Sequence, residues 1–424
     1  YTVYTYDNIG NPISVKTGAK SSELANIDNA TGGVITTYTY DALGRKTGET
    51  APDGSTISYE YDLQGRLTKK TVGNNVPETY TYDVFDNLIS KQRDGESISY
   101  TYNAVGARTS MTDSTGTTNY AYDPFGNLTT EAKNGIVKSY TYDVLGNRTS
   151  FNAANGENSV IGNTYAYDNM GRLTSVTNGA DTVSYTYDAN SNRLSTALNG
   201  TVTNTATYNK GNLPVEIKNF DGGTLVDTTA FAYYFDGNVR NQVVTTANDS
   251  TSTNYRYDGV GRLTKERTYS ESDTFDYTNE YFYDNYGNRR IFMQTDDQKN
   301  TKTSVKYTFD SKNKLVKSHF SCYNSDTSQT RSVNTNYTYD DFGNTVSVTE
   351  NDELAKTYTY DAFNRLSTYT ADGITASYTY DGDNLRQSKT VNGSTVNHLL
   401  DGANVVADIY PDSTNIYVYG NGVE

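Results

Sequence analysis

Aromatic and hydroxyl-bearing side chains alternate in short runs along the whole chain. Typical runs are Tyr80-Thr-Tyr-Asp83, Tyr120-Ala-Tyr-Asp123, Tyr140-Thr-Tyr-Asp143 and Tyr358-Thr-Tyr-Asp361. A period of two places both rings on one face of a β-strand and the residue between them on the other face. Each run therefore predicts a strand that has one aromatic face and ends at the Asp.

The same run returns at a regular spacing, mostly 20 or 21 residues. Its closing position falls at 7, 41, 62, 83, 103, 123, 143, 168, 188, 209, 236, 258, 284, 310, 340, 361 and 381, which makes 17 units, with a degenerate further unit around Asp401. The two Tyr positions of these units hold 31 of the 41 Tyr. Self-similarity at a fixed period predicts a repeat architecture, in which each unit contacts mainly its neighbours.

Each run is followed by a turn. Three residues after the Asp, ten units carry Gly, as at Gly126 and Gly146, four carry Asn and one carries Asp. These residue types adopt positive φ at the lowest cost, and the Asp side chain can accept backbone N–H groups across such a turn. The residues to which we assign a structural role in the repeat are Tyr80, Tyr82, Asp83, Tyr120, Tyr122, Asp123, Gly126, Tyr140, Tyr142, Asp143, Gly146, Tyr358, Tyr360 and Asp361.

A second turn lies about halfway between units and has the sequence Asx-Gly. Its copies are Asp53-Gly54, Asp94-Gly95, Asn134-Gly135, Asn178-Gly179, Asn199-Gly200, Asp372-Gly373 and Asn392-Gly393. Asx-Gly between alternating runs is a strong signal for a β-hairpin. Two turns per unit give roughly 34 antiparallel strands, too many for one open twisted sheet, so we expect the ribbon to curl. We predict an all-β fold: about 17 tandem hairpins wound into a spiral, hollow β-shell or barrel that forms a single domain over residues 1–424.

Composition narrows the function classes. Hydrophobic residues make up 34% of the chain, mean hydropathy is −0.73 and Trp is absent, which is little apolar material for a solid core. The chain is nevertheless too aromatic, and its repeat too regular, for a disordered protein. A net charge of −15 argues against a nucleic-acid partner. No apolar run reaches the ~20 residues of a membrane span. The single Cys322 cannot form an internal disulfide, and we expect the chain to be an excised piece of a longer protein.

Some stretches depart from the repeat. We expect a surface loop at residues 21–33, with a short helix over 22–27 as an alternative, and an insertion at 151–163 that lengthens one unit. The repeat loosens over about 200–336, where the turn after Asp236 is shortened and the strands or loops are longer. Residues 402–424 predict two plain alternating strands, at 404–410 and 416–420.

Candidate chemistry is sparse, and we predict no catalytic residue, no metal site and no cofactor. His319 and Cys322 lie three residues apart and could suggest a thiol nucleophile, but no further partner is evident, and His398 occupies a Tyr position of the repeat, which favours packing. The carboxylates at 340–341 and at 381 and 383 do not match a calcium loop, so we assign them to turn capping. Arg after the turn can stack on a Tyr or pair with an Asp, and the positions concerned are Arg45, Arg66, Arg148, Arg172, Arg262 and Arg365.

The pattern Tyr-x-Tyr-Asp-x-x-Gly-[Asn/Arg]-[Arg/Leu]-x-[Ser/Thr] resembles the YD repeat of the RHS-repeat superfamily. That superfamily includes bacterial RHS toxins, wall-associated proteins of Gram-positive bacteria, the B and C subunits of insecticidal toxin complexes, and teneurins. The segment from Tyr417 to Gly422, Tyr-Val-Tyr-Gly-Asn-Gly, is similar to the lead-in of the RHS core module, whose downstream segment is not in this sequence. The resemblance implies a hollow β-shell that encloses a C-terminal polypeptide, and it gives no ground for self-cleavage by these residues.

From this resemblance we expect a non-enzymatic shell from a secreted or cell-surface bacterial protein, whose partner is a C-terminal toxin or another polypeptide cargo of the same protein. Two alternatives remain open. A row of Tyr also suits an adhesion module that binds a cell-surface carbohydrate or protein, and a long ribbon could serve as a cell-wall spacer.

Overall fold

The computed structural model describes residues 2–17, 33–272, 276–310 and 312–419, and these residues form 37 β-strands and no helix. The predicted loop at 21–33, with its alternative helix, lies almost wholly outside the described residues. The strands of the first half are β1 (Thr2–Tyr6), β2 (Pro12–Thr17), β3 (Val34–Tyr40), β4 (Lys46–Thr50), β5 (Thr56–Tyr61), β6 (Leu67–Val72), β7 (Glu78–Tyr82), β8 (Leu88–Arg93), β9 (Glu96–Tyr102), β10 (Arg108–Asp113), β11 (Gly116–Tyr122), β12 (Leu128–Lys133), β13 (Ile136–Tyr142), β14 (Arg148–Asn155), β15 (Asn158–Tyr167), β16 (Leu173–Asn178), β17 (Asp181–Tyr187) and β18 (Arg193–Leu198). Those of the second half are β19 (Thr201–Tyr208), β20 (Pro214–Asp221), β21 (Thr224–Tyr233), β22 (Val239–Thr246), β23 (Ser250–Tyr257), β24 (Leu263–Ser270), β25 (Asp276–Tyr283), β26 (Arg289–Asp296), β27 (Thr301–Phe309), β28 (Leu315–Asn324), β29 (Gln329–Tyr339), β30 (Thr345–Glu350), β31 (Glu353–Tyr360), β32 (Leu366–Ala371), β33 (Ile374–Tyr380), β34 (Arg386–Val391), β35 (Ser394–Asp401), β36 (Asn404–Ile409) and β37 (Thr414–Ile416).

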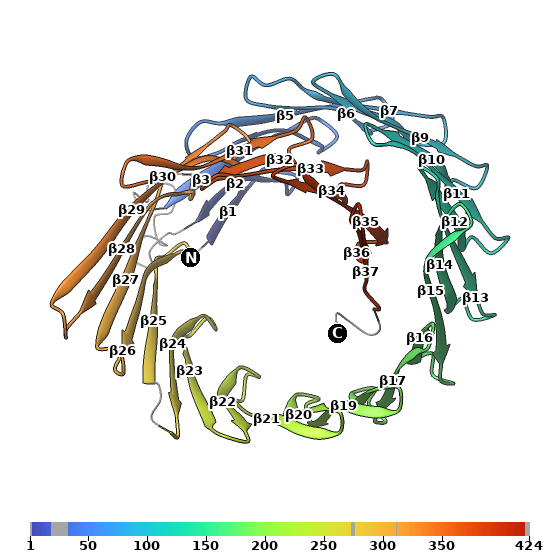
Figure 1. The fold of residues 1–424 in the computed structure, drawn as a ribbon. Helices are drawn as coiled ribbons and strands as arrows, with labels where there is room; N and C mark the ends of the chain where they lie inside the picture. The colour runs from blue at the N-terminus through green and yellow to red at the C-terminus, as the bar shows by residue number, and fades with distance from the viewer. Residues whose placement is uncertain (1, 18–32, 273–275, 311, 420–424) are drawn as a thin grey trace.

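The strands form one antiparallel sheet in which each strand pairs with the next strand in sequence, from β1–β2 to β36–β37. The sheet does not close on itself. Instead the ribbon winds round a central space for more than one revolution, and its last strands pass inside its earlier ones (Figure 1). The prediction of an all-β, spiral, hollow ribbon is therefore confirmed.

The turn after each Tyr-x-Tyr-Asp run, which we call the YD turn, has one repeated geometry. In the copy at Asp83, the Asp N–H donates to the carbonyl of Asn87 at 3.0 Å and the N–H of Asp86 donates to the carbonyl of Asp83 at 3.3 Å. The φ of Asp86 is +70°, and that of Gly126 in the next unit but one is +89°. The predicted left-handed position is confirmed, and the register shifts by one residue at the last Tyr of the run, a β-bulge that adds to local twist.

The second turn of each unit, the Asx-Gly turn, lies at the opposite edge of the ribbon. Asp94 and Gly95 have φ values of +49° and +80°, and Asn134 and Gly135 have +50° and +84°. Positive φ at both central residues is the signature of a type I′ turn, whose twist matches that of the flanking strands. The ribbon therefore has two chemically different edges, a YD rim and an Asx-Gly rim.

Where the ribbon overlaps itself, residues 312–419 (the inner coil) lie against residues 46–187 (the outer coil). Hydrogen bonds between the coils join residues that are 253 to 282 positions apart, which is the length of one revolution. Almost all of the buried hydrophobic side chains belong to these two coils. The part of the chain that the structure describes therefore forms a single layer away from the overlap, and its hydrophobic clusters lie at the overlap.

Two sequence assignments are corrected. The unit that we aligned on Asp236 closes instead on Tyr234, because the Tyr234 N–H bonds the carbonyl of Asn238 and Gly237 takes the left-handed position. The turn there is of ordinary length. The strand expected at 416–420 is also wrong in its bounds, since β37 ends at Ile416. The loosened stretch over 200–336 consists of longer strands, of eight to eleven residues from β19 to β29.

Candidate functional site: the concave face and the overlap of the coils

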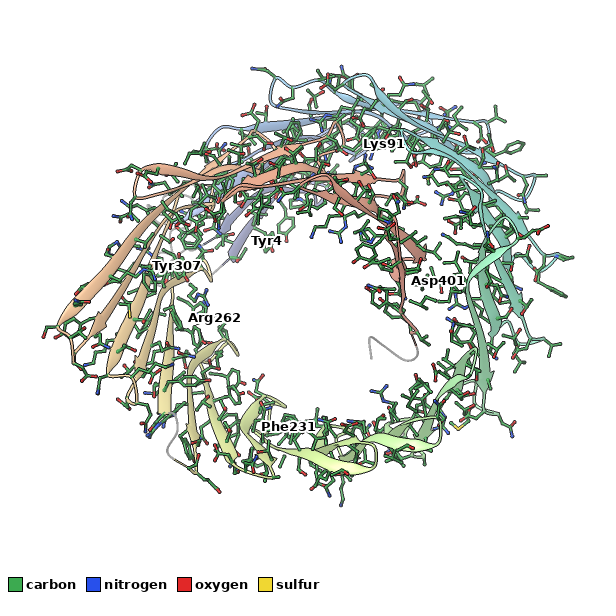
Figure 2. All side chains as sticks on the ribbon, viewed as in Figure 1. Tyr4, Lys91, Phe231, Arg262, Tyr307 and Asp401 are labelled. Atoms are coloured by element: carbon green, nitrogen blue, oxygen red, sulfur yellow. The ribbon has the colours of Figure 1, made fainter. Side chains whose placement is uncertain are left out.

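The aromatic face of the ribbon is its concave face. Tyr4 and Arg262 lie on the inside of the ring (Figure 2). In the outer coil, Tyr140 and Phe151 pack against Leu399 of the inner coil, which passes inside it. The side chains that line the central space are thus mainly the Tyr rings of the repeat and the residues between them.

The second Tyr of each run holds neighbouring hairpins together. Its hydroxyl donates to the carbonyl of the residue that begins the strand after the preceding YD turn, as from Tyr142 to Leu128 at 2.9 Å. The ladder between β12 and β13 begins only at Thr130, so Leu128 has no ladder partner on β13, and an unpaired carbonyl is costly where it is shielded from water. The same bond, at 2.5 to 3.0 Å, is made by Tyr40, Tyr61, Tyr82, Tyr102, Tyr122, Tyr142, Tyr167, Tyr187, Tyr208, Tyr233, Tyr257, Tyr283, Tyr339 and Tyr360.

The first Tyr of many runs stacks with a cation. The guanidinium of Arg108 lies 4.8 Å from the ring centroid of Tyr120 and 5.7 Å from that of Tyr100. Burial, assisted by nearby Asp383, raises the pKa of Tyr100 to about 12. The Tyr100 hydroxyl therefore stays neutral at physiological pH, and the faces of many concave rings are already occupied by guanidinium groups.

The Arg that follows the YD turn makes both contacts expected from the sequence. Arg66 pairs through Nε with Asp62 of its own turn at 2.7 Å, donates through Nη1 to the carbonyl of Asp83 in the next turn at 2.8 Å, and lies 4.9 Å from the centroid of the Tyr82 ring. Arg45, Arg172, Arg262 and Arg365 likewise pair with the Asp of their own turn and stack on the next unit's Tyr. Arg148 differs, because its ion-pair partner is Asp401 of the inner coil, at 2.7 Å.

The Asp of each YD turn caps the turn through its side chain. The Asp143 carboxylate accepts hydrogen bonds from the N–H groups of Leu145 and Asn147, both at 2.9 Å, and from the Asn147 amide at 2.9 Å. The Asn147 side-chain bond is the main cause that lowers the pKa of Asp143. Asp83, Asp123 and Asp361 make the corresponding bonds, and Asp340 and Asp381 also cap their turns, as expected. The side chains of Asp341 and Asp383, which we also assigned to turn capping, instead contact the outer coil, at Asn75 and Arg108.

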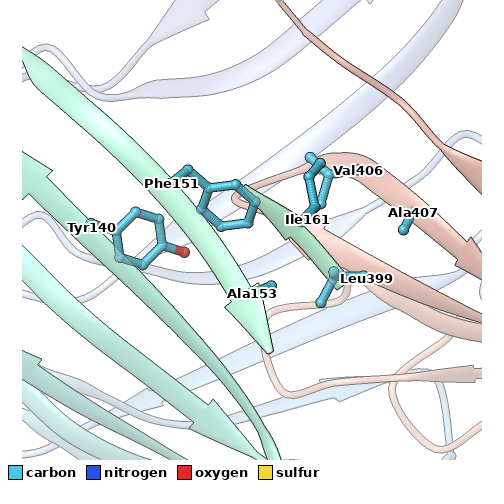
Figure 3. Packing of buried hydrophobic residues seen from close by; sticks show 7 residues of the cluster. All are labelled: Tyr140, Phe151, Ala153, Ile161, Leu399, Val406 and Ala407. Atoms are coloured by element: carbon cyan, nitrogen blue, oxygen red, sulfur yellow. The ribbon is translucent and has the colours of Figure 1, made fainter. Parts of the chain in front are cut away.

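The overlap is closed by a hydrophobic cluster that joins the two coils. Phe151 is fully buried and stacks at 5.4 Å on the ring of Tyr140. Ala153 and Ile161 complete the outer half, and the inner half is Leu399, Val406 and Ala407 (Figure 3). At its edge, the Arg108 guanidinium binds both carboxylate oxygens of Asp383 at 2.6 and 2.7 Å. The inner coil is thus fixed to the outer coil by apolar packing and two Arg–Asp pairs.

A cavity of about 570 Å³ lies between the coils beside this cluster. Its charged wall residues are mostly paired with one another, as Lys138 is with Glu131 at 2.6 Å. His398 belongs to the same wall, and its Nδ1 lies 2.6 Å from Asp408. His398 Nε2 is buried and has no hydrogen-bond partner among the described residues.

The other candidate chemistry is not brought together. His319 and Cys322 are both on β28, and an odd separation places them on opposite faces of the strand. His319 Nδ1 lies 2.9 Å from the side-chain oxygen of Asn334. Within the described ranges, no three His, Cys, Asp or Glu side chains are placed to hold a metal ion, and no helix is long and apolar enough to cross a membrane.

Sequence reasoning missed the Tyr hydroxyl bonds and the overlap cluster. A signal for the cluster was present, because Leu399-Leu-Asp-Gly-Ala-Asn-Val-Val406 is one of the most apolar stretches of a polar chain. Nothing in the local pattern, however, connects that stretch to Phe151.

Several solved structures match nearly the whole chain, and two of them illustrate the likeness. A crystal structure of TcdB2-TccC3-Cdc42 matches 96% of this chain and 24% of its own, with 14% identity and a TM-score of 0.54. A structure of the Photorhabdus luminescens Tc holotoxin pore, with the mutation TccC3-D651A, matches 98% of this chain and 29% of its own, at 13% identity and a TM-score of 0.49. The chain thus spans about a quarter of the length of these structures. No curated protein matches it by sequence.

The family comparison covers nearly the whole chain. The model of the teneurin YD-shell matches residues 5–160, 139–318 and 198–391 in overlapping registers, as a repeat protein should. The likeness to the solved structures, at low identity, is one of fold. The match of sequence and the spiral ribbon agree, and the chain belongs to the teneurin YD-shell family.

Proposed function

We propose that this YD-shell encloses a polypeptide cargo of the same protein and keeps it from solvent and from proteases. The observation that carries the proposal is the course of the last strands. β34–β37 pass inside the arc of β9–β15 (Figure 1), and Tyr419, the last described residue, packs against the Phe151 cluster. A polypeptide attached after Tyr419 therefore starts inside the shell.

The concave surface suits a cargo that is held without tight binding. Its Tyr hydroxyls are bonded to backbone carbonyls, as Tyr122 is to Arg108 at 2.9 Å, and its cations are paired with carboxylates. A surface whose polar groups are already satisfied gives an unfolded segment few strong contacts. The role is that of a physical container, and it requires no catalytic residue. A third component, Cdc42, is named beside TcdB2 and TccC3 in one structure of similar fold.

The test is protection of a reporter. In the test protein, a flexible segment with one protease site is fused after Glu424. In the control protein, the same segment is inserted between Gly222 and Gly223, in an exposed hairpin turn. Enclosure predicts much slower cleavage of the C-terminal segment than of the inserted one. Equal cleavage rates in the folded protein would show that the chain does not shield a polypeptide attached to its C-terminus.

We also propose a secreted or cell-surface location. Labelling of intact cells with an impermeant reagent, compared with labelling of lysed cells and of the culture medium, tests this directly. Protein found only after lysis would contradict it. Two alternatives stay predictions that no observation favours: an adhesion module that binds a glycan or a protein, and a spacer. The guanidinium groups stacked on the concave rings would compete with a sugar for the same ring faces.

A further inference from the structure

The YD rim of the outer coil carries a row of exposed apolar side chains. They occupy the first or second position after the Asp or Asn that begins successive YD turns. Examples, with exposed fractions between 77% and 99%, are Leu63, Phe85, Val105, Phe125 and Leu145. Hairpins repeat every two strands, so successive tips are about 10 Å apart. Single exposed apolar residues are ordinary, but a regular row along one edge marks an interaction surface.

The same position is covered in the inner coil. Phe342 and Phe363 occupy it there, and both are half-buried. The Phe342 ring lies over the Arg93 guanidinium at 4.0 Å and the Phe363 ring lies over the Lys91 ammonium at 4.6 Å. One unit further on, Gly382 fits against Ile98, which is buried. The tips of the YD turns are therefore the docking elements of the inner coil.

The receiving surface is also defined. Arg93 directly precedes the Asx-Gly turn at Asp94 and Lys91 lies two residues before Arg93, so the rings dock on the outer coil close to its Asx-Gly rim. Polar contacts follow the same rule, because Lys312 of a YD turn pairs with Asp53 of an earlier Asx-Gly turn, and Asp341 accepts a hydrogen bond from Asn75. The inner coil thus sets its YD rim on the concave, cationic side of the outer coil, one revolution earlier in sequence.

We propose that the exposed YD rim of the outer coil docks on a further coil of YD-repeat ribbon, supplied by the part of the same protein that precedes Tyr1. This contact would repeat the interface between the two coils. The exposed apolar residues of the outer YD rim occupy the same turn position as Phe342 and Phe363 of the inner coil. One revolution later in sequence, those two rings are covered by the coil outside them. A solved structure of similar fold has a chain about four times as long, which leaves room for such a coil.

A second copy of this chain does not fit the same role. The inner coil passes inside the outer coil (Figure 1), so the radius decreases along the sequence. The inner coil of another molecule is therefore too narrow to receive the outer rim on its concave face. The receiving coil must be wider than residues 46–187 and must carry Arg or Lys beside its Asx-Gly turns.

Hydroxyl-radical footprinting tests this on two proteins, the 424-residue chain and the longer natural chain that contains it. In the shorter chain we expect Phe85 and Phe125 to be oxidised much faster than Phe363. In the longer chain the rates at Phe85 and Phe125 should fall to that of Phe363, while exposed Tyr323, outside the YD rim, keeps its rate as an internal control. Unchanged oxidation of both Phe in the longer chain overturns the proposal, as does a natural protein with no YD repeats before Tyr1.

Variants separate docking from folding. Phe363→Ser should lower the melting temperature of the 424-residue chain, whereas Phe125→Ser should not, because nothing in the described residues covers Phe125. In the longer chain both substitutions should lower it. A Phe125→Ser protein that melts with the wild type in the longer chain contradicts the proposal. Self-association of the 424-residue chain that protects Phe85 and Phe125 also overturns it, since the occupant would then be a second copy.

Discussion

Phe151 tests whether the overlap of the two coils stabilises the shell. The structure offers a matched pair for this purpose, because Phe151 and Phe292 occupy the same position in different units. Phe292 stacks on Tyr281 at 5.5 Å, as Phe151 does on Tyr140 at 5.4 Å, and each Phe lies beneath an Arg of its own unit, at 5.9 and 5.7 Å. The local surroundings are alike, but only Phe151 is covered by the inner coil.

The expected cost follows from burial. Phe151 is 0% exposed, and truncation of a fully buried Phe to Ala typically costs about 3–5 kcal/mol. Phe292 is half-buried and loses mainly its aromatic pair, worth about 0.5–1.5 kcal/mol, and part of its apolar burial, so we expect about 1–2 kcal/mol in total. The difference of roughly 2 kcal/mol, about thirtyfold in an equilibrium constant, is the contribution of the inner coil.

Hydrogen exchange measured by mass spectrometry suits this comparison, because a repeat protein need not unfold as one cooperative unit. In Phe151→Ala, exchange should accelerate in residues 399–407 as well as around position 151. In Phe292→Ala, the acceleration should stay within β25–β27. The reasoning is refuted if the two variants lose the same stability, or if residues 399–407 keep their protection in Phe151→Ala.

Three further predictions concern the hairpins and their turns. Tyr142→Phe removes one hydrogen bond to a backbone carbonyl and should lower the free energy of unfolding by about 0.5–1.5 kcal/mol in chemical denaturation; no change would mean that water replaces the hydroxyl at no cost. Gly382→Ala places a Cβ 2.7 Å from two buried side chains of the outer coil and should lower the free energy of unfolding by about 1–3 kcal/mol. Gly259→Ala is the control, because Gly259 has the same turn position and its added Cβ would meet nothing within 4 Å. Equal melting temperatures of the two variants would contradict the docking of the Gly382 turn. Hydrogen bonds in the turn, chiefly from the Asn87 side chain, hold the pKa of Asp83 in the folded protein below its ordinary value of 3.8. The ionised Asp83 therefore stabilises the turn fully above pH 3.8, and this stabilisation is lost as the pH falls through the lower pKa of the folded state. Thermal melts from pH 7 to pH 2.5 should show a steep loss below about pH 4 that Asp83→Asn makes shallower, and a melting temperature independent of pH would refute the assignment.

The sequence by itself determined the local architecture of this protein. Tyr-x-Tyr fixed the faces of the strands, the Asp with a residue of positive φ three positions later fixed the YD turn, and Asx-Gly fixed the other turn, because each depends on interactions within one hairpin. The one misaligned unit, at Asp236, shows the same rule. Gly237, three residues after Tyr234, already marked the true register, but the more conspicuous Asp drew the alignment two residues away.

Only the tertiary structure decided where the coils meet. Phe151 and Leu399 are far apart in the chain, and their contact depends on the sum of small twists over the whole revolution between them. A small error in each hairpin, repeated over such a length, moves the contact by many residues, so no local pattern specifies it. The same holds for His398, whose Tyr position predicted packing but whose pairing with Asp408 depends on the last hairpin. The repeat therefore encodes a ribbon, and the accumulated twist of that ribbon makes it a shell.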